Sequence, residues 1–388
     1  MYTFLEPVQI ISPTYFLLTA TLVCSLSCLA TGTSWGTAAT FGVALMGIGG
    51  GLGINPAMTA GAVVSGAIFG DKLSPISDTV NLSSATCEVN VFDHIKSVAT
   101  ATVPGYIIAL VVSVFLGMKY SSGQINDQQI GPLLNILSDN FNITPMYAII
   151  SLIPMILVVV LALRKFNALA TIVISALVGM LIAIIFQGYT LVDMMSYMNY
   201  GYVIDTGNFD VDKLLNRGGL QSMMWTVSIG YLGLSYGGIL EKTGVLDTLL
   251  FSARAFTSNS RNLIITQMIA GFATIAATAS PYVSILIPGR MFIAGYDKLG
   301  INRTVASRTL EHSGICLDPL LPWSLGAVYF SGVLGVSPLE YGPYAILCWT
   351  VPVIAFFYAV TGMFVWKVDS PSDNINDAEE IYKDGVTK

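Results

Sequence analysis

The sequence predicts an all-α polytopic membrane protein built from two structural repeats with broken helices and re-entrant hairpins. The first observation is composition: of 388 residues, 54% are hydrophobic and 10% are charged, and the mean hydropathy is +0.71. Soluble domains carry about 25% charged residues. The second observation is a series of long uncharged segments, and the third is an internal repeat. Together they exclude a soluble globular protein.

The uncharged segments define the expected helices. A helix of about 18 or more apolar residues crosses the roughly 30 Å hydrocarbon layer of a bilayer. Seven segments reach that length: Pro13–Ala30, Val98–Met118, Ile143–Leu163, Phe166–Gln187, Gly219–Leu240, Asn262–Ser280 and Pro343–Trp366. Shorter apolar pieces are Thr37–Gly50, Ala57–Gly70, Val283–Ile293 and Leu320–Leu334. We therefore expect full spans mixed with half-length helices.

Several other classes of protein are not indicated. No basic cluster predicts nucleic-acid binding, and the start MYTFLEPVQIIS lacks the positive charge of an ordinary signal peptide. The chain shows no nucleophile–base arrangement, no cofactor loop and no structural metal site, so we expect neither an enzyme nor a bound cofactor. The possibility of a homo-oligomer is left open. Five cysteines are expected to be small apolar packing residues: Cys24, Cys28, Cys87, Cys316 and Cys348.

An internal repeat appears when the chain is aligned with itself, without gaps, so that Leu52 falls on Leu299. In this register the run Leu52–Asn55 falls on Leu299–Asn302, and Asp71 falls on Asp318. Paired halves of this kind are typical of secondary transporters, whose substrate sites lie where corresponding helices are interrupted.

Both halves contain such an interruption. The stretch ATGTSWGT covers Ala30–Thr37, and its counterpart ATASPYVS covers Ala277–Ser284. Broken helices leave backbone groups unpaired, which lipid does not tolerate but a water-filled cavity does. Carbonyls and the hydroxyls of Thr31, Thr33 and Ser34 are suitable ligands for a hard monovalent cation. The alternative is a Gly/Thr face for helix packing.

A second interruption in the first half carries charge. The stretch Pro7–Gly70 contains no Asp, Glu, Lys, Arg or His. The charged stretch GDKLSPISDT then begins at Gly70. A charge in a membrane segment is costly and indicates function. We expect Asp71 and Asp78 to hold a proton or a sodium ion in competition, with Thr79 and Asn81 as neutral oxygen ligands. Lys72 pairs with one aspartate or marks the membrane edge; alternatively, the whole stretch is a solvated loop.

The matching region of the second half is similarly polar. Glu311 and Asp318 complete the predicted ion site, and Arg308 is expected to pair with Glu311 on one helical face. His312 is a candidate proton sensor, against the alternative of an ordinary surface or interface residue. Arg303 and Arg308 are alternatively placed to receive an organic carboxylate.

Three stretches resemble the NhaC family of bacterial sodium/proton antiporters: LATGTSWGTAATFGVALMGIG (Leu29–Gly49), SGAIFGDKLSPISDTVNLS (Ser65–Ser83), and SRTLEHSG followed by PLLPW (within Ser307–Trp323). The resemblance covers about Phe16 to Trp366. It implies a multi-pass protein of the cell (inner) membrane with two inverted repeats, exchanging sodium ions for protons. The family also includes sodium- and proton-linked malate/lactate exchangers. The chain departs from what the resemblance leads us to expect at one position, where it has His312 in place of an acidic residue.

The repeat and the resemblance together predict the organisation of the chain. Residues 1–120 are expected to form a first transport repeat that lacks its N-terminal helices, because partners of Phe166–Gln187 and Gly219–Leu240 would precede Met1. Residues 121–260 would hold a connecting loop and scaffold helices, 261–366 the core of the second repeat, and 367–388 a disordered tail. The expected function is sodium/proton exchange; the alternatives are small-carboxylate exchange and a truncated homologue that does not transport.

Overall fold

The computed structural model describes residues 13–118, 150–164, 168–207, 219–244 and 258–368, together with 146, 212 and 216. These residues are almost entirely helical, as predicted, and the one β-bridge reported among them joins Ile301 to Lys367. The chain divides into two compact units. The first takes residues up to Gly70, Leu110–Ile229 and Val328–Ala345; the second takes Asp71–Ala109, Gly230–Ala327 and residues from Ile346 onward.

The helices distribute between the units as follows. The first unit contains α2 (Pro13–Thr31), α3 (Ser34–Thr37), the π-helix η2 (Ala38–Gly42), α4 (Val43–Gly51), α10 (Ile153–Leu163), α11 (Ala168–Gln187), α12 (Leu191–Tyr200), α20 (Pro338–Tyr341) and the 3-10 helix η6 (Gly342–Tyr344). The second contains α6 (Asp78–Thr86), α16 (Ser260–Thr278), α17 (Pro281–Lys298), α18 (Arg303–Leu310), the π-helix η4 (Glu311–Ile315), the 3-10 helix η5 (Asp318–Leu320) and α21 (Ile346–Thr361). Residues of α5 (Pro56–Leu73), α7 (Val91–Met118), α14 (Leu220–Lys242) and α19 (Leu325–Leu334) are shared between them.

Close packing in the first unit depends on glycines of α5. A Cβ atom at Gly66 would lie 2.3 Å from the carbonyl oxygen of Thr21, and one at Gly70 would lie 2.5 Å from that of Ser25. Small residues let two membrane helices approach until their backbones touch. The fragment Pro56–Gly70 therefore packs directly on α2.

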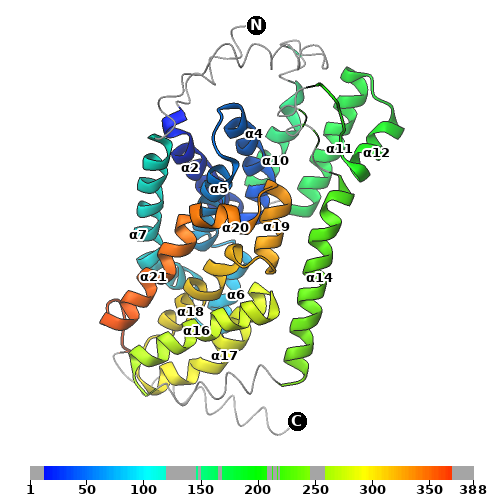
Figure 1. Cartoon of the computed structure of the whole chain (residues 1–388). Coiled ribbons are helices and arrows are strands. Elements are labelled where there is room, and N and C mark those ends of the chain that lie inside the picture. Colours follow the sequence, from blue (N-terminus) through cyan, green and yellow to red (C-terminus); the bar gives the residue numbers. More distant parts are fainter. Residues whose placement is uncertain are drawn as a thin grey trace. The chain divides into compact units, whose positions relative to one another are not determined.

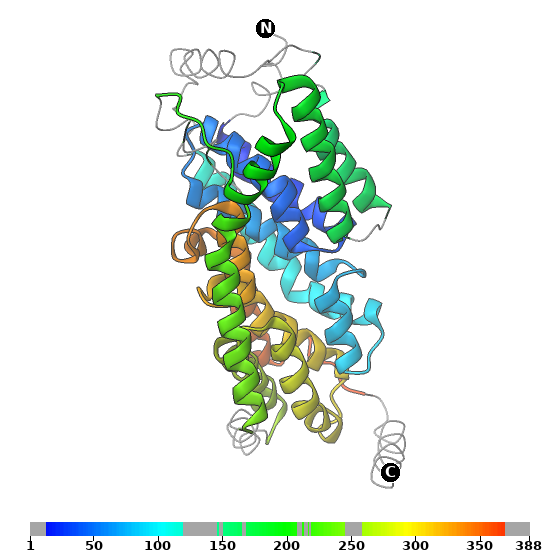
Figure 2. The same cartoon turned by 90° about the vertical axis from the view of Figure 1, so that its right-hand side faces the viewer.

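The second unit is built around α16 and α17, which lie side by side (Figures 1 and 2). Its core includes Leu263, Phe292, Tyr296 and Ile301, all at most 1% exposed. The hydroxyl of Tyr296 donates to the side-chain oxygen of Gln267 over 2.5 Å, so the polar end of this buried ring is satisfied.

The two predicted interruptions are breaks between helices. In the first, α2 ends at Thr31, Gly32 is left-handed with φ 71°, and the Thr33 hydroxyl accepts from Gly36 N over 3.2 Å to begin α3. In the second, α16 ends at Thr278, Ala279 takes the left-handed conformation with φ 57°, and the Ser280 hydroxyl accepts from Val283 N over 3.4 Å to begin α17. Both breaks thus combine a left-handed residue with a hydroxyl cap, which is how helices commonly end and restart.

Helix ends recur in the register of the sequence repeat, the one that places Leu52 on Leu299. The paired positions are the ends of α2 and α16 (Thr31, Thr278), the ends of α4 and α17 (Gly51, Lys298), and the starts of α5 and α18 (Pro56, Arg303), α6 and α19 (Asp78, Leu325) and α7 and α20 (Val91, Pro338). Turn hydrogen bonds recur as well: Gly53 N donates to Gly50 O over 3.0 Å, and Gly300 N donates to Asp297 O over 3.0 Å.

Two described helices, α2 and α7, are each long and apolar enough to cross a membrane. The pair Pro338–Tyr344 and Ile346–Thr361, bent by 62°, adds a third if it is one span. Part of the predicted span Ile143–Leu163 lies outside the described residues. The segment Ala57–Gly70 was predicted to be short, but α5 continues through Asp71 and Lys72 to Leu73 and reaches 18 residues.

The predicted division at residues 120, 260 and 366 follows the repeats, whereas the compact units interleave segments from along the chain. The division by repeats stays a prediction. Residues 369–388 of the predicted tail lie outside the described residues.

Candidate functional site

The charged stretch after Gly70 contains a break between α5 and α6. Pro75 has no N–H to donate and lies between the two helices, at Ser74–Ser77. The amide nitrogen of the Asn81 side chain donates to Pro75 O over 2.9 Å and to Ser77 O over 2.6 Å, which holds the connecting turn. Asp71 and Lys72 therefore lie in the last turn of α5, and Asp78 begins α6.

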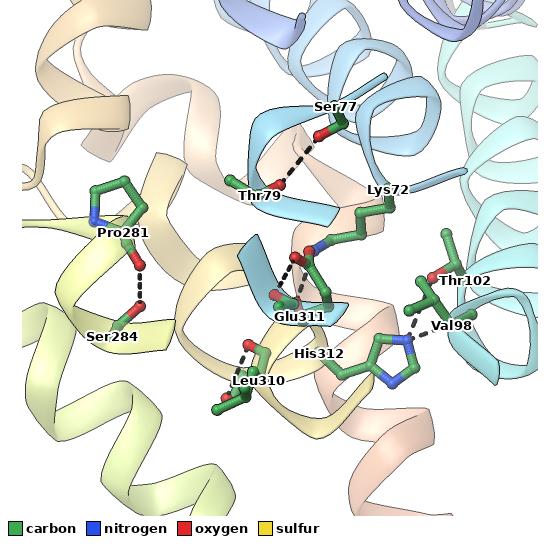
Figure 3. A network of polar contacts seen from close by, with 12 residues as sticks. Lys72, Ser77, Thr79, Val98, Thr102, Pro281, Ser284, Leu310, Glu311 and His312 are labelled. Atoms are coloured by element: carbon green, nitrogen blue, oxygen red, sulfur yellow. Dashed lines mark hydrogen bonds and ion pairs between the residues drawn. The ribbon is translucent and has the colours of Figure 1, made fainter. Parts of the chain in front are cut away.

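A buried ion pair joins this stretch to the second half of the chain. Lys72 Nζ lies 2.8 Å from Glu311 Oε2 and 2.6 Å from the Glu311 carbonyl oxygen, and both side chains are 0% exposed (Figure 3). Ser83 Oγ donates to the other carboxylate oxygen, Oε1, over 2.8 Å. Each carboxylate oxygen thus accepts a bond, which a buried charge requires.

This pair corrects three sequence predictions. Lys72 binds Glu311 rather than an aspartate, and it is fully buried rather than marking a membrane edge. The solvated-loop alternative is wrong, because Asp71 is only 5% exposed. Glu311 pairs with Lys72 rather than Arg308, because the π-helical turn begins at Glu311 and changes the expected helical register. Lys72 and Glu311 are 239 residues apart in the chain, so their local sequences do not predict the pair.

Asp71 and Asp318 fall on each other in the sequence register that places Leu52 on Leu299, and both side chains are buried. They are 5% and 6% exposed. A serine lies six residues after each aspartate: the Ser324 hydroxyl donates to the backbone carbonyl oxygen of Asp318, and the Ser77 hydroxyl shares a hydrogen bond with that of Thr79 over 3.2 Å. Gly326 N also donates to Asp318 Oδ1 over 3.2 Å. Both carboxyl groups are thus buried beside a break in the helix.

Asp78 is exposed and differs from these two. Its Oδ2 accepts from the hydroxyl of Tyr282 over 2.7 Å, and its Oδ1 accepts from Thr79 N over 2.9 Å. Asp71, Asp78 and Asp318 all act electrostatically on the Tyr282 hydroxyl. The second unit therefore contains all three predicted aspartates, and Asp78 is hydrogen-bonded to Tyr282.

The two arginines that were alternatively predicted to receive an organic carboxylate, Arg303 and Arg308, are engaged in other contacts. Arg303 pairs with Asp297, Nε to Oδ1 over 2.9 Å, and with Glu88. The Arg308 guanidinium carbon lies 5.0 Å from the ring centre of Trp366, a cation–π contact. His312 is 1% exposed, so it is not a surface residue, and its Nε2 lies 3.1 Å from the Val98 carbonyl oxygen (Figure 3).

The predicted hydroxyl ligands lie in the first unit, at the break after α2. Thr33 uses its hydroxyl as the cap of α3. Ser34 is 7% exposed. The hydroxyl of Thr31 is buried and finds no hydrogen-bond partner among the described residues. Its counterpart Thr278 instead donates to Thr274 O over 2.8 Å.

Comparisons with known proteins agree with this chemistry. The model of the Na+/H+ antiporter family matches residues 6–86 and 66–363. The Na(+)/H(+) antiporter NhaC of Alkalihalophilus pseudofirmus is 36% identical over 363 residues, 93% of this chain and 77% of that protein. The chain belongs to the NhaC family of Na+/H+ antiporters.

Relatives with other printed activities also match. The malate-2H(+)/Na(+)-lactate antiporter of Bacillus subtilis is 35% identical over 92% of this chain and 76% of its own length. The arginine/ornithine antiporter ArcD of Halobacterium salinarum is 30% identical over 95% of this chain and 76% of its own length. Membership of a family of antiporters indicates a membrane transporter rather than an enzyme.

Three residues at this site were not predicted from the sequence. Tyr282 was not considered as a partner of Asp78, Ser83 was not considered as a partner of Glu311, and His94 was not considered as a site residue. The exposed start of α7 gives no sign that His94 is fully buried. A rule that treats every histidine next to an apolar helix as a candidate would have found it.

Proposed function

We propose that this NhaC-family chain exchanges sodium ions for protons across the cell (inner) membrane, as a multi-pass protein, with coupling at a carboxylate site where two repeats meet. The observation that carries the proposal is the buried cluster of the second unit. It joins Lys72 of the first motif to Glu311 of the second, and Asp71 and Asp318 are buried in the same unit.

The repeat underlying this proposal is supported by the backbone. Five helix ends and the turn hydrogen bonds at Gly53 and Gly300 recur in the single register that places Asp71 on Asp318. An ungapped sequence register has no reason to reproduce helix ends unless the two halves share a fold. We infer that the halves are inverted repeats with broken helices and re-entrant segments, the arrangement that places substrate sites at interrupted helices.

The chemistry of the site follows from burial. Lys72 and Glu311 neutralise each other, so Asp71 and Asp318 are the buried carboxyl groups left to accept a cation. Burial penalises an isolated carboxylate, so it holds either a proton or a sodium ion. If the protein reorients only when the site is filled, one ion leaves as the other enters.

Further oxygens are proposed as sodium ligands in each unit. In the second unit these are the carboxylate of Asp78 and the neutral oxygens of Thr79 and Asn81, all in the first turn of α6. In the first unit Thr31, Thr33 and Ser34 surround the break after α2, and the Thr31 hydroxyl has no partner among the described residues. A buried hydroxyl without a partner costs free energy unless a ligand uses it.

The alternative substrate is a small carboxylate, which the printed activity of the Bacillus subtilis relative suggests. An organic carboxylate needs an available cation. Lys72 is bound by Glu311, Arg303 by two carboxylates, and Arg308 faces the Trp366 ring. These engaged cations favour sodium/proton exchange over carboxylate exchange.

Everted membrane vesicles test the proposal. A pH-sensitive dye should report sodium-dependent proton movement in vesicles that contain the chain and no organic acid. Vesicles with the Asp71→Asn chain should show none, because an amide cannot hold the charge or the proton. Proton movement that requires added malate or lactate would favour the alternative, and no movement under either condition would contradict both.

A further inference from the structure

His94 is a fully buried histidine in the first turn of α7. Its side chain is 0% exposed, and its Nδ1 lies 2.8 Å from Ser307 Oγ on α18. Its Nε2 is buried and has no hydrogen-bond partner among the described residues. A buried ring nitrogen without a hydrogen-bond partner is rare, since buried polar atoms normally form hydrogen bonds.

The bonds of Ser307 determine which nitrogen carries the proton. Ser307 Oγ donates to the carbonyl oxygen of Thr304 over 3.1 Å. A hydroxyl has one hydrogen, and with that hydrogen on the Thr304 carbonyl oxygen, Ser307 accepts from His94 Nδ1–H. In the neutral ring the other nitrogen, Nε2, therefore holds a bare lone pair, and a proton can add there without breaking the Nδ1–H bond.

Charged groups of the ion site act on this ring. Glu311 of η4 and Lys72 of α5 both influence it electrostatically. His312, the other titratable group of η4, also acts on it electrostatically, and the charged residues of α18 are Arg303 and Arg308. On α7 itself, Asp93 and Lys96 pair with each other at 57% and 78% exposure. His94 is thus the neutral base next to a charge-balanced Lys72–Glu311 pair.

A solvent-accessible groove lies close to this ring although the ring is buried. The groove has a volume of about 400 Å³ and is lined by residues that include Asn90, Asp93, Ser97 and Thr304. Ser97 Oγ donates over 3.0 Å to the same Thr304 carbonyl that Ser307 binds. One residue, Thr304, therefore separates the groove from Ser307, the hydrogen-bond partner of His94.

We propose that His94 takes up a proton at Nε2 and that this proton and a sodium ion in the carboxylate cluster exclude each other by charge. In the step, a hydronium ion gives one proton to the Nε2 lone pair and becomes water, and the ring becomes an imidazolium ion. The buried cluster then gains one positive charge, the same charge that sodium would bring. The inference deepens the proposed sodium/proton exchange and rests on it.

His312 provides the matched control. It is equally buried, but its Nε2 contacts the Val98 carbonyl oxygen at 3.1 Å and the Thr102 hydroxyl at 3.4 Å. A carbonyl oxygen only accepts, so this nitrogen already carries a proton and has no free lone pair. The two histidines of the chain thus differ in the feature on which the proposal depends.

The experiment measures the KM for sodium in proteoliposomes between about pH 4 and pH 8, because burial disfavours the charged form of the His94 ring and its titration therefore extends below the ordinary imidazole range. One proton that excludes one sodium ion raises the KM by up to about tenfold per pH unit of acidification. In His94→Asn, whose amide nitrogen can replace Nδ1–H, the rise should be up to about tenfold smaller per pH unit than in the natural chain, because only protons on the carboxyl groups still compete with sodium, whereas His312→Gln should keep the rise of the natural chain. A natural rise in His94→Asn would overturn the proposal.

A second measurement is independent of transport and of how the His94 variant folds. In His312→Gln, His94 is the only histidine of the chain, so its ¹⁵N resonances can be followed through a pH titration. Sodium at saturating concentration should move the midpoint to lower pH, because it disfavours the imidazolium. A midpoint that sodium does not move would refute the role of His94. If the natural chain shows no exchange, the proposed function fails. This titration still decides whether proton binding to His94 and sodium binding compete.

Discussion

Breaking the buried pair between Lys72 and Glu311 should strongly destabilise the protein, whereas replacing both partners should not. Each side chain is 0% exposed, and Glu311 accepts 2.8 Å bonds from Lys72 and Ser83. Removing one partner from a buried pair leaves an uncompensated charge and costs about 3–5 kcal/mol. We expect that cost from Lys72→Met and from Glu311→Gln separately.

The double variant should lose much less than the sum of the single losses. Methionine keeps most of the lysine volume, and the glutamine oxygen can still accept from Ser83, so the remaining defect is about one unsatisfied amide, or about 1–3 kcal/mol. The expected coupling energy between the two positions is therefore at least about 3 kcal/mol.

Equilibrium unfolding in mixed micelles, followed by circular dichroism while a denaturing detergent is added, measures this cycle. The exposed pair of Lys96 and Asp93, at 78% and 57% exposure, is the control and should couple by less than about 1 kcal/mol. Our account of the cluster would be refuted if the losses from Lys72→Met and Glu311→Gln added within about 0.5 kcal/mol.

Three further predictions use the same assays. Gly66→Ala should lower the free energy of unfolding by about 1–3 kcal/mol or more, because its Cβ would lie 2.3 Å from a backbone oxygen of α2. The control Gly50→Ala, whose Cβ would have nothing within 4 Å, should leave that free energy unchanged. Equal losses in the two variants would contradict the packing. Thr31→Val should change the free energy of unfolding by less than about 0.5 kcal/mol, because it removes a hydroxyl that has no partner among the described residues. It should nevertheless raise the KM for sodium. An unchanged KM would exclude Thr31 as a sodium ligand. Asp71→Asn should abolish exchange. Asp318→Asn should raise the KM for sodium about tenfold or more, because it loses about 1.5–3 kcal/mol of hydrogen bonding to a charged group. A KM equal to that of the natural chain in Asp318→Asn would limit the site to the first half.

Much of the fold was predictable, because local rules determine it. Apolar length predicts helices, and the Gly–Thr and Ala–Ser pairs at the two breaks predict where helices end. The repeat register, seen first in the sequence, reappears in helix ends because equivalent backbones need equivalent turns. The continuation of α5 through Asp71 and Lys72 was missed, because those charges resemble a loop until their burial is known.

The partners of the charged residues could not be predicted in the same way. Lys72 and Glu311 are 239 residues apart, and nothing in their local sequences indicates that they meet. Arg308 lies three residues before Glu311, the spacing of a pair on a regular helix, but the chain enters a π-helical turn at Glu311. Spacing rules hold only while the helix keeps about 3.6 residues per turn.

The residues at the two breaks differ in a way that affects movement. Gly32 has no Cβ and enters or leaves the left-handed region without steric cost. Ala279 holds the same conformation against a penalty of about 1–2 kcal/mol, and its carbonyl oxygen is held by a 2.9 Å bond from Leu325 N. The first break is therefore an unstrained hinge and the second a strained one, so a rearrangement that bends both halves begins more easily at Gly32.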